Sequence, residues 1–153
     1  MKGYDKLPLL SLLALAALPL WGDSLKPFTT DGCSLFPEGT SEQQSLWAEC
    51  CIRHDLAYWQ GGTEAQRETA DQALHACVSQ VGEPEIAKLM LAGVRLGGSP
   101  FFPTSYRWGY GWSFQRGYAP LTPQEREQVR RELQRLKLIL QGLDQALEAD
   151  HPQ

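Results

Sequence analysis

The chain has 153 residues, of which 42% are hydrophobic and 21% are charged, so it is long enough for one domain with a modest hydrophobic core. Its formal net charge is -4, and it contains no basic run. These features argue against a nucleic-acid-binding protein, whose binding surface carries clustered Lys and Arg. They also provide no general electrostatic attraction to anionic lipid.

The N-terminal segment, residues 1–22, is predicted to be a targeting segment rather than part of the fold. It has a weakly basic start, and residues 7–20 form an uncharged apolar stretch that is too short for a comfortable membrane span. The small residues Gly22 and Ser24 mark the region where cleavage of a signal peptide is expected. An uncleaved membrane anchor is the alternative. Both interpretations predict a secreted or periplasmic protein.

The predicted export from the cytoplasm determines how the cysteines are interpreted. The chain has four of them, Cys33, Cys50, Cys51 and Cys77. In an oxidising compartment, an even number of cysteines predicts two disulfides. A zinc site is the less favoured interpretation, because zinc ligands usually come in pairs separated by about two to four residues. Neighbouring side chains such as those of Cys50 and Cys51 diverge on a helix instead.

The first predicted elements are a loop and a pair of helices. Residues 25–40 contain Pro, Gly, Asp and Thr without a helical period, which indicates a loop. A helix is expected over about residues 41–59, where two adjacent glycines end it. Residues 63–66, TEAQ, have the pattern of a capping box, so a second helix is expected to start there and to reach residue 80. The short connection predicts that the two helices lie antiparallel.

Two further helices are predicted, with an aromatic segment between them. A helix is expected over residues 84–96, with Pro84 in its first turn. Residues 99–120 hold eight of the 15 aromatic residues of the chain. This segment is predicted either to face lipid, because Trp and Tyr suit the membrane interface, or to fold back onto the core. Another capping box at residues 122–125 opens a long helix that is expected to reach residue 149.

The long C-terminal helix carries an apolar stripe with a near-heptad period. Its side chains recur at spacings of 4-3-4-3-4 residues. Packing against the rest of the chain is the favoured role of this stripe, and a homodimer through the C-terminal helix is the alternative. The predicted organisation is a signal peptide at 1–22, a domain with the aromatic-rich loop at 25–120, and an amphipathic helix at 121–153. The stripe consists of Val129, Leu133, Leu136, Leu140, Leu143 and Leu147.

One short stretch, CCIRHDLAYW at residues 50–59, combines two thiols, an imidazole, a carboxylate and a phenol. On a helix, residues three and four apart are neighbours on one face. His54, Asp55 and Tyr58 therefore share a face with Cys51, and Cys50 lies on its flank. This face of the first helix is where we expect a functional site.

The register of the two antiparallel helices follows from pairs of residues whose numbers have nearly the same sum. A register that brings Cys50 to Cys77 also places Asp71 opposite His54. Two pairings that agree on one register support each other more than either does alone. They predict a Cys50–Cys77 disulfide and an imidazole that is oriented by a carboxylate.

The two remaining cysteines, Cys33 and Cys51, are left to form the second disulfide. This bond would hold the loop at residues 31–33 against the first turn of the helix, and Asp31 would then lie near Asp55. Two carboxylates, together with backbone carbonyls from a loop that contains glycine, suit a hard cation. The most natural one is Ca2+.

These residues resemble a known family. The pattern C-C-x-x-H-D-x-x-Y at residues 50–58 resembles the active-site helix of the secreted phospholipase A2 superfamily. The sequence DGCSLFPEG at residues 31–39 is similar to the calcium loop of its bacterial and fungal branch. The resemblance covers about residues 29–79 and implies a mainly α, phospholipase A2-like fold, in which two disulfide-linked antiparallel helices are joined by additional C-terminal helices. The aromatic segment and the C-terminal helix have no counterpart in it.

The resemblance also implies a role for each site residue. His54 would be the general base that activates water, and Asp71, supported by Tyr58, would fix the tautomer of its ring. The implied reaction is calcium-dependent hydrolysis of the sn-2 ester of phospholipids, with a membrane surface as the partner and no nucleic acid. The implied calcium ligands are the side chains of Asp31 and Asp55 and the backbone carbonyl of Gly32.

Two other functions are open from the sequence. One is a non-catalytic calcium- or lipid-binding envelope protein on the same scaffold. The other is a disulfide-stabilised interaction protein that uses the leucine stripe. The enzyme is favoured over both, because a binding protein has no need of a base at His54 that is oriented by Asp71.

Overall fold

The computed structural model describes residues 23–150, and the predicted signal peptide at 1–22 lies outside these residues. The described part of the chain is mainly α-helical and contains no strand, which confirms the predicted fold class at that level. Its elements are α1 (Ala48–Gln60), α2 (Glu64–Gln80), α3 (Pro84–Gly97), the short 3-10 helix η1 (Phe114–Arg116) and α4 (Pro123–Asp150).

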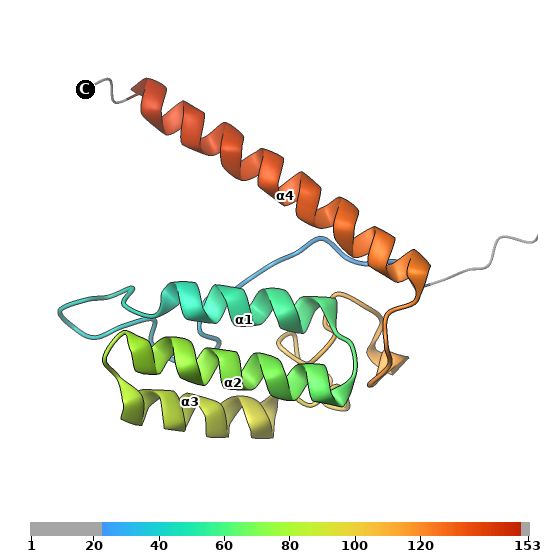
Figure 1. The fold of residues 1–153 in the computed structure, drawn as a ribbon, viewed down its shortest axis with the longest axis horizontal. Helices are drawn as coiled ribbons and strands as arrows, with labels where there is room; N and C mark the ends of the chain where they lie inside the picture. Colours follow the sequence, from blue (N-terminus) through green and yellow to red (C-terminus); the bar gives the residue numbers. More distant parts are fainter. Residues whose placement is uncertain (1–22, 151–153) are drawn as a thin grey trace, which may run out of the picture.

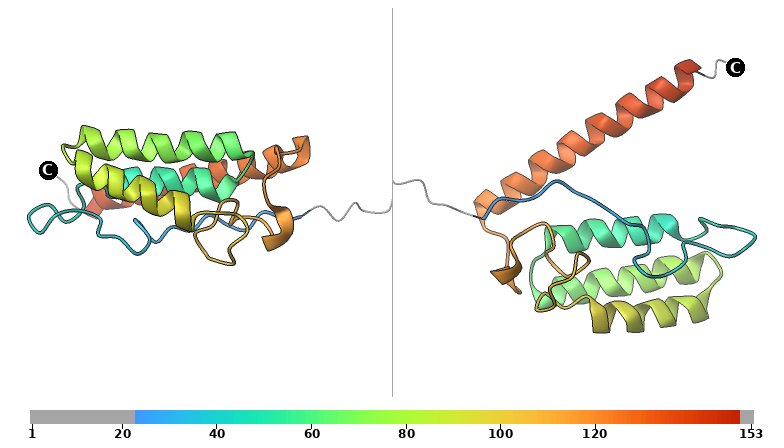
Figure 2. Two further views of the ribbon diagram at one scale, coloured as in Figure 1. Left: turned by 90° about the horizontal axis from the view of Figure 1, so that it is seen from below. Right: turned by 180° about the vertical axis from the view of Figure 1, so that it is seen from behind.

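Helices α1, α2 and α3 run alongside one another, and α4 projects away from them (Figures 1 and 2). Helix α2 packs against both α1 and α3. The aromatic segment leaves the end of α3 and returns past the α1–α2 turn before α4 begins (Figure 1). None of the helices within residues 23–150 is long and apolar enough to cross a membrane.

The turn between α1 and α2 is short because glycines and a cap define it. Gly61 and Gly62 have φ angles of 66° and 140°, which residues other than glycine rarely adopt. The Thr63 hydroxyl accepts a hydrogen bond from the backbone N–H of Gln66, and the Gln66 side chain accepts one from the backbone N–H of Thr63. This capping box starts α2 where the sequence predicts it.

Helix α1 begins at Ala48, and the expectation that it begins near residue 41 is wrong. Residues 41–47 form bends and turns, because their polar groups find partners outside a helix. The Trp47 backbone N–H donates to the Glu38 carbonyl at 3.0 Å, and its indole N–H donates to the Pro37 carbonyl at 2.6 Å. The other three α-helices begin and end within about one residue of their predicted bounds.

Both predicted disulfides are present. The Cys50–Cys77 bond joins α1 to α2, with Cα atoms 5.7 Å apart. The Cys33–Cys51 bond ties the preceding loop to the start of α1, with Cα atoms 4.9 Å apart. The described residues contain no free cysteine. The disulfides therefore hold α1 on two sides, against α2 and against the loop.

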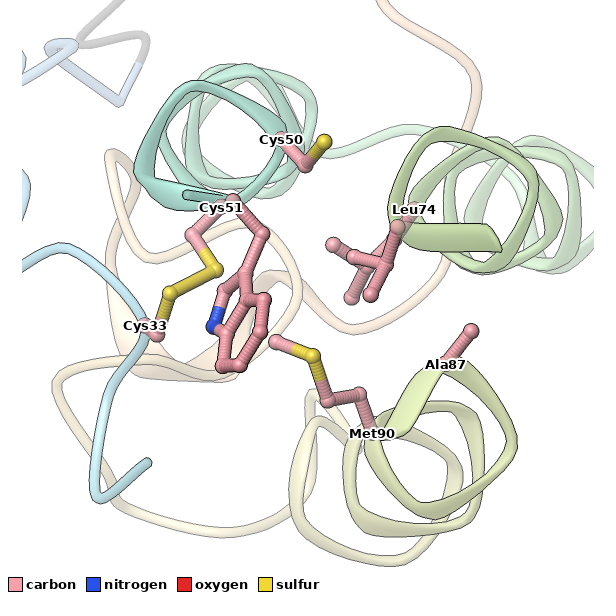
Figure 3. Close-up of a cluster of buried hydrophobic side chains, with 8 residues drawn as sticks. Cys33, Cys50, Cys51, Leu74, Ala87 and Met90 are labelled. Carbon is pink, nitrogen blue, oxygen red and sulfur yellow. A yellow bond between two sulfur atoms is a disulfide. The ribbon is translucent and has the colours of Figure 1, made fainter. Parts of the chain in front are cut away.

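The core between the first three helices is small. Figure 3, in which these helices are seen end-on, shows Leu74 of α2 and Met90 of α3 pointing toward the Cys33–Cys51 bond, while Ala87 of α3 faces α2. These side chains are buried, together with those of Trp47 and Val78. Because so few aliphatic side chains fill this core, the disulfides are expected to contribute a large share of its stability.

The aromatic segment is divided between the core and the surface. Trp108 and Trp112 are buried, and their indole N–H groups donate to the carbonyls of Gly62 and Gln60 at 2.9 and 2.7 Å. The segment thus covers the C-terminal end of α1. Its exposed aromatic side chains are Phe101, Phe102 and Phe114.

Helix α4 contacts the rest of the protein only through its first part. Val129 is buried with Trp59 and Trp112, and Leu133 packs against the same cluster. The Gln128 side chain accepts a hydrogen bond from the backbone N–H of Leu25 at 2.9 Å. Beyond Leu133 the side chains of α4 are mostly exposed. The expectation that the whole leucine stripe packs against the chain is therefore wrong for its C-terminal part.

Replacing both Cys50 and Cys77 with Ala should lower the free energy of unfolding by about 2–5 kcal/mol, because the bond closes a loop with a sequence separation of 27 residues. Urea denaturation of the variant and the parent protein measures this difference. Non-reducing peptide mapping of the parent should recover the Cys33–Cys51 and Cys50–Cys77 peptides. A Cys33–Cys77 peptide, or unchanged stability in the variant, would contradict the prediction.

Candidate active site

A buried polar contact joins α1 to α2. His54 Nε2 lies 3.0 Å from Asp71 Oδ1, and the Tyr58 hydroxyl donates to the same oxygen at 2.7 Å. All three side chains are buried, and that of Asp71 is completely inaccessible. His54 and Tyr58 are one helical turn apart, which lets both reach a single carboxylate on α2. The three residues that the sequence suggests as catalytic therefore lie together.

The contact with Asp71 determines which ring nitrogen of His54 is available for chemistry. A carboxylate only accepts hydrogen bonds, so Nε2 carries the proton and Nδ1 keeps its lone pair. Among residues 23–150, Nε2 is the ring nitrogen with a hydrogen-bond partner. His54 also lines an apolar pocket of about 330 Å³. Nδ1 can therefore accept a proton from a molecule that reaches the ring.

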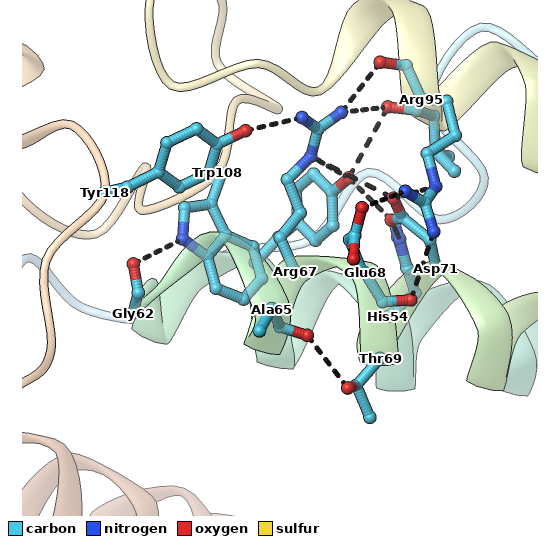
Figure 4. A network of polar contacts seen from close by, with 12 residues as sticks. His54, Gly62, Ala65, Arg67, Glu68, Thr69, Asp71, Arg95, Trp108 and Tyr118 are labelled. Atoms are coloured by element: carbon cyan, nitrogen blue, oxygen red, sulfur yellow. Dashed lines mark hydrogen bonds and ion pairs between the residues drawn. The ribbon is translucent and has the colours of Figure 1, made fainter.

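Two arginines surround Asp71, and the sequence interpretation did not include them in the site. Arg95 Nε lies 3.0 Å from Asp71 Oδ2 without the alignment of a hydrogen bond, and Arg67 Nε lies 3.9 Å away. Arg67 also donates to the hydroxyls of Tyr58 and Tyr118, at 3.1 and 2.7 Å, and to two carbonyls near the end of α3 (Figure 4). The two guanidinium groups compensate the buried negative charge.

The Tyr58 hydroxyl is held as a hydrogen-bond donor. Burial, and then the negative charge of Asp71, raise the pKa of Tyr58 above its usual value. The phenol therefore stays protonated and can donate to Asp71. The Arg67 N–H group donates to the same hydroxyl oxygen, so this one side chain connects the guanidinium to the carboxylate.

The apolar pocket is bounded by α1, α3 and the loop that follows Cys33. Two glycines in its wall, Gly93 within α3 and Gly98 at the C-cap of this helix, influence its shape. A Cβ atom at Gly98 would lie 2.5 Å from the Tyr58 hydroxyl, so glycine is needed for α3 to come this close to the site. A Cβ atom at Gly93 would meet nothing within 4 Å, so this residue leaves the pocket wide. The larger apolar side chains that line the pocket are Leu35, Phe36, Leu74, Leu89, Met90 and Val94.

A second, polar hollow of about 200 Å³ contains the two carboxylates that the sequence predicts as calcium ligands, Asp31 and Asp55. Asp55 Oδ2 accepts a hydrogen bond from the Thr30 hydroxyl at 2.6 Å, and Asp31 Oδ1 accepts one from the Ser34 hydroxyl at 2.6 Å. Gly32, the third predicted ligand, lines the apolar pocket and not this hollow.

The donor set of the polar hollow fits a hard cation that is held weakly. Burial, and to a smaller extent the nearby Asp31 carboxylate, raise the pKa of Asp55 to about 6, against the opposing effects of the Thr30 hydrogen bond and of His54. A cation between the two carboxylates would remove their repulsion. Within the described residues no cluster of three or more His, Cys, Asp or Glu side chains could hold a metal ion. Hydroxyls, backbone carbonyls and water would have to complete the coordination.

The loop before α1 is fixed by residues from distant parts of the chain. The Tyr110 hydroxyl lies 2.6 Å from the Thr29 carbonyl and 3.2 Å from the Asp55 carbonyl, so the aromatic segment connects the loop to α1. Ser34 and Leu35 have positive φ angles of 31° and 58°, which cost on the order of 1–3 kcal/mol each. This strained stretch places Leu35, which is 92% exposed, at the mouth of the apolar pocket.

The parts of the site that lie on one helix or on a paired helix can be predicted from the sequence. Arg67 lies four positions before Asp71, which indicates proximity, and the register that pairs His54 with Asp71 also places it opposite Tyr58. It is nevertheless set aside at the level of the sequence, as a side chain that is more often solvated or ion-paired than functional. Arg95, Thr30 and Tyr110 carry no such signal, because their contacts depend on tertiary packing.

No protein-family model, curated protein or solved structure matches the chain.

Calcium binding should weaken as the pH falls through about 6, because only the deprotonated Asp55 carboxylate binds a cation and its pKa is raised to about 6. Titration calorimetry at about pH 8 and about pH 5 measures this change. The dissociation constant at the higher pH is expected to be on the order of 10⁻⁴–10⁻³ M. Asp55→Asn should abolish binding, whereas Glu49→Gln, at an exposed position of α1, should not. Unchanged binding in Asp55→Asn would remove Asp55 as a ligand.

Proposed function

We propose that this protein is a calcium-dependent, phospholipase A2-like hydrolase that cleaves the sn-2 ester of phospholipids outside the cytoplasm. The observation that carries the proposal is the His54–Asp71 contact beside an apolar pocket. A buried carboxylate that fixes one nitrogen of an imidazole leaves the other nitrogen as a general base. The resemblance of residues 50–58 to the active-site helix of the family supports the same chemistry.

In the proposed reaction, His54 Nδ1 takes a proton from a water molecule as the water oxygen attacks the sn-2 carbonyl carbon. Asp71 keeps the proton on Nε2 and stabilises the imidazolium that forms. The imidazolium then returns its proton to the glycerol oxygen as the carbon–oxygen bond breaks. The products are a lysophospholipid and a free fatty acid. Ca2+ bound by Asp31 and Asp55 would supply polarisation of the ester carbonyl.

The apolar pocket supports a substrate with an acyl chain. Leu74, Met90 and Val94 line it next to His54, so an aliphatic chain there would lose its contact with water. Leu35 and Leu89 also line the pocket and are exposed, which would let them contact lipid as it enters. The polar hollow at Asp31 and Asp55 supports a cation beside the ester rather than beside the chain.

A non-catalytic calcium- and lipid-binding protein is the second candidate. The same pocket and carboxylates would serve it, and the observation that favours it is the small number of carboxylates at the polar hollow. The oriented imidazole favours the hydrolase, because binding alone does not need a base held by a buried acid. The two candidates differ in whether fatty acid is released.

His54→Gln should remove hydrolysis, with a loss on the order of 10²–10⁴ in rate, because the general base is lost. Asp71→Asn should cost less, because the imidazole remains while control of its tautomer is lost. Fatty-acid release from mixed phospholipid vesicles, with calcium and with a chelator, measures the activity. His75→Gln, a half-buried histidine of α2 outside the pocket, is the matched control and should retain activity.

Circular dichroism and calcium titration should show that the His54→Gln protein is folded and binds calcium. If the parent protein releases no fatty acid from any phospholipid vesicle at millimolar calcium, the binding protein is the better interpretation. If hydrolysis occurs and survives His54→Gln, the proposed mechanism fails while the fold stands.

Gly93→Leu should reduce hydrolysis of long-chain phospholipids roughly tenfold relative to short-chain ones. The new side chain would enter the pocket and displace about two buried methylene groups, at about 0.8 kcal/mol each. The fold should be retained, because Leu is a better helix former than Gly. Ala92→Leu, at the exposed neighbouring position, is the control and should leave the preference unchanged. An equal loss on long and short chains would show that the pocket does not hold the acyl chain.

A further inference from the structure

The C-terminal part of α4 exposes a row of leucines that the rest of the described chain does not cover. Leu140, Leu143 and Leu147 are 64%, 56% and 63% exposed. Figures 1 and 2 show this part of α4 extending away from α1, α2 and α3. An isolated helical segment of this length is only marginally stable in water. We therefore expect a partner to pack against the exposed leucines and to stabilise this part of α4.

The spacing of this row indicates the kind of partner. The stripe continues at alternating steps of three and four residues from Val129, which is buried in the core, to Leu147. An average step of about 3.5 residues keeps one seam facing a second helix in a two-stranded coiled coil. We propose that α4 pairs with α4 of a second copy of this chain in an antiparallel coiled coil. This pairing is independent of the proposed hydrolysis.

The charges on the flanks of the seam support an antiparallel register. In such a pair, facing residues of the seam share one sum of residue numbers, and flanking residues come within two of that sum. Leu136 therefore meets Leu147 of the partner subunit, and Leu140 meets Leu143 of the partner subunit. The same register brings Lys137 beside Asp144 of the partner subunit. Twofold symmetry repeats this contact, which gives two intermolecular ion pairs.

The opposite flank agrees with the same register. Ile139 would lie beside Ala146 of the partner subunit, so an apolar side chain meets an apolar one. A parallel pair would instead place Ile139 beside Asp144 of the partner subunit. The ion pair left to Lys137 in a parallel arrangement would be with Glu132 of the partner subunit. The Glu132 carboxylate already accepts a hydrogen bond from the backbone N–H of Phe28 at 3.4 Å. The antiparallel arrangement therefore pairs opposite charges on one flank of the seam and apolar side chains on the other.

A lipid surface fits this face less well than a second copy does. From Arg135 onward α4 carries two basic and three acidic residues and no aromatic residue. Helices that lie in a membrane interface are typically rich in Lys and Arg and bury Trp or Phe. The pairing spans about two heptads, so the dimer is expected to be weak, with a dissociation constant on the order of micromolar.

Sedimentation equilibrium of the purified protein at rising concentration should give a mass that increases from one chain to two. Leu140→Asp should keep the protein monomeric throughout this range, because it buries an unpaired carboxylate in the seam. Leu138→Asp is the matched control, since Leu138 is 59% exposed on the opposite side of α4, and it should still dimerise. A monomeric parent protein at hundreds of micromolar, or a dimeric Leu140→Asp protein, overturns the proposal.

Charge reversal tests the register. Lys137→Glu alone should weaken the dimer, because it faces Asp144 of the partner subunit, and adding Asp144→Lys should restore it. A double variant that stays as weak as the single one overturns the antiparallel register. Vesicle flotation tests the alternative, in which a lipid surface binds the exposed leucine row of α4. Binding of monomeric protein to zwitterionic or anionic vesicles that is lost in Leu140→Asp would assign the face to lipid and overturn the proposal.

Discussion

The burial of the Asp71 carboxylate is the constraint on which the arrangement of the helices depends. An unpaired charge in this position would cost several kcal/mol, so every neighbouring element contributes a partner. Helix α1 provides His54 and Tyr58, α2 provides Arg67, and α3 provides Arg95. The contacts hold only while the three helices keep one register, and the Cys50–Cys77 disulfide fixes the register of α1 against α2. The network that stabilises the bundle thus also orients the imidazole.

The aromatic segment stabilises this network from the far end of α1. Its indole groups bond the free carbonyls at the α1–α2 turn, which a helix end otherwise leaves to water. The backbone N–H of Gly109 donates to the Tyr58 carbonyl at 2.7 Å, and the Trp108 ring packs edge-on against the Tyr58 ring at 5.1 Å. The phenol that supports Asp71 is therefore held by its backbone and by its ring. The part of the aromatic segment that folds back onto the core, one of the two positions that the sequence leaves open, thus belongs to the scaffold of the site.

The sequence predicts those features that depend on neighbours along a helix or on one helix pair. The capping box, the two disulfides and the approach of His54 to Asp71 all follow from local spacing and a single register. The start of α1 was misplaced because Trp47 bonds back into the loop, and periodicity does not encode such a bond. Arg95 and Tyr110 reach the site through packing of α3 and of the aromatic segment. Their positions depend on how distant segments meet, and hydrophobic periodicity does not specify this.

Helix α1 separates two environments of opposite polarity, and this boundary bears on the substrate. His54 lines the apolar pocket, while its neighbour Asp55 borders both this pocket and the polar hollow that contains Asp31. Tyr106 also borders both. A ligand that reaches His54 Nδ1 would place an apolar portion in the pocket on one side of the imidazole and a polar portion toward the hollow on the other. An ester within an amphipathic lipid has this division of polarity, whereas a wholly polar ester would leave the apolar pocket without a partner.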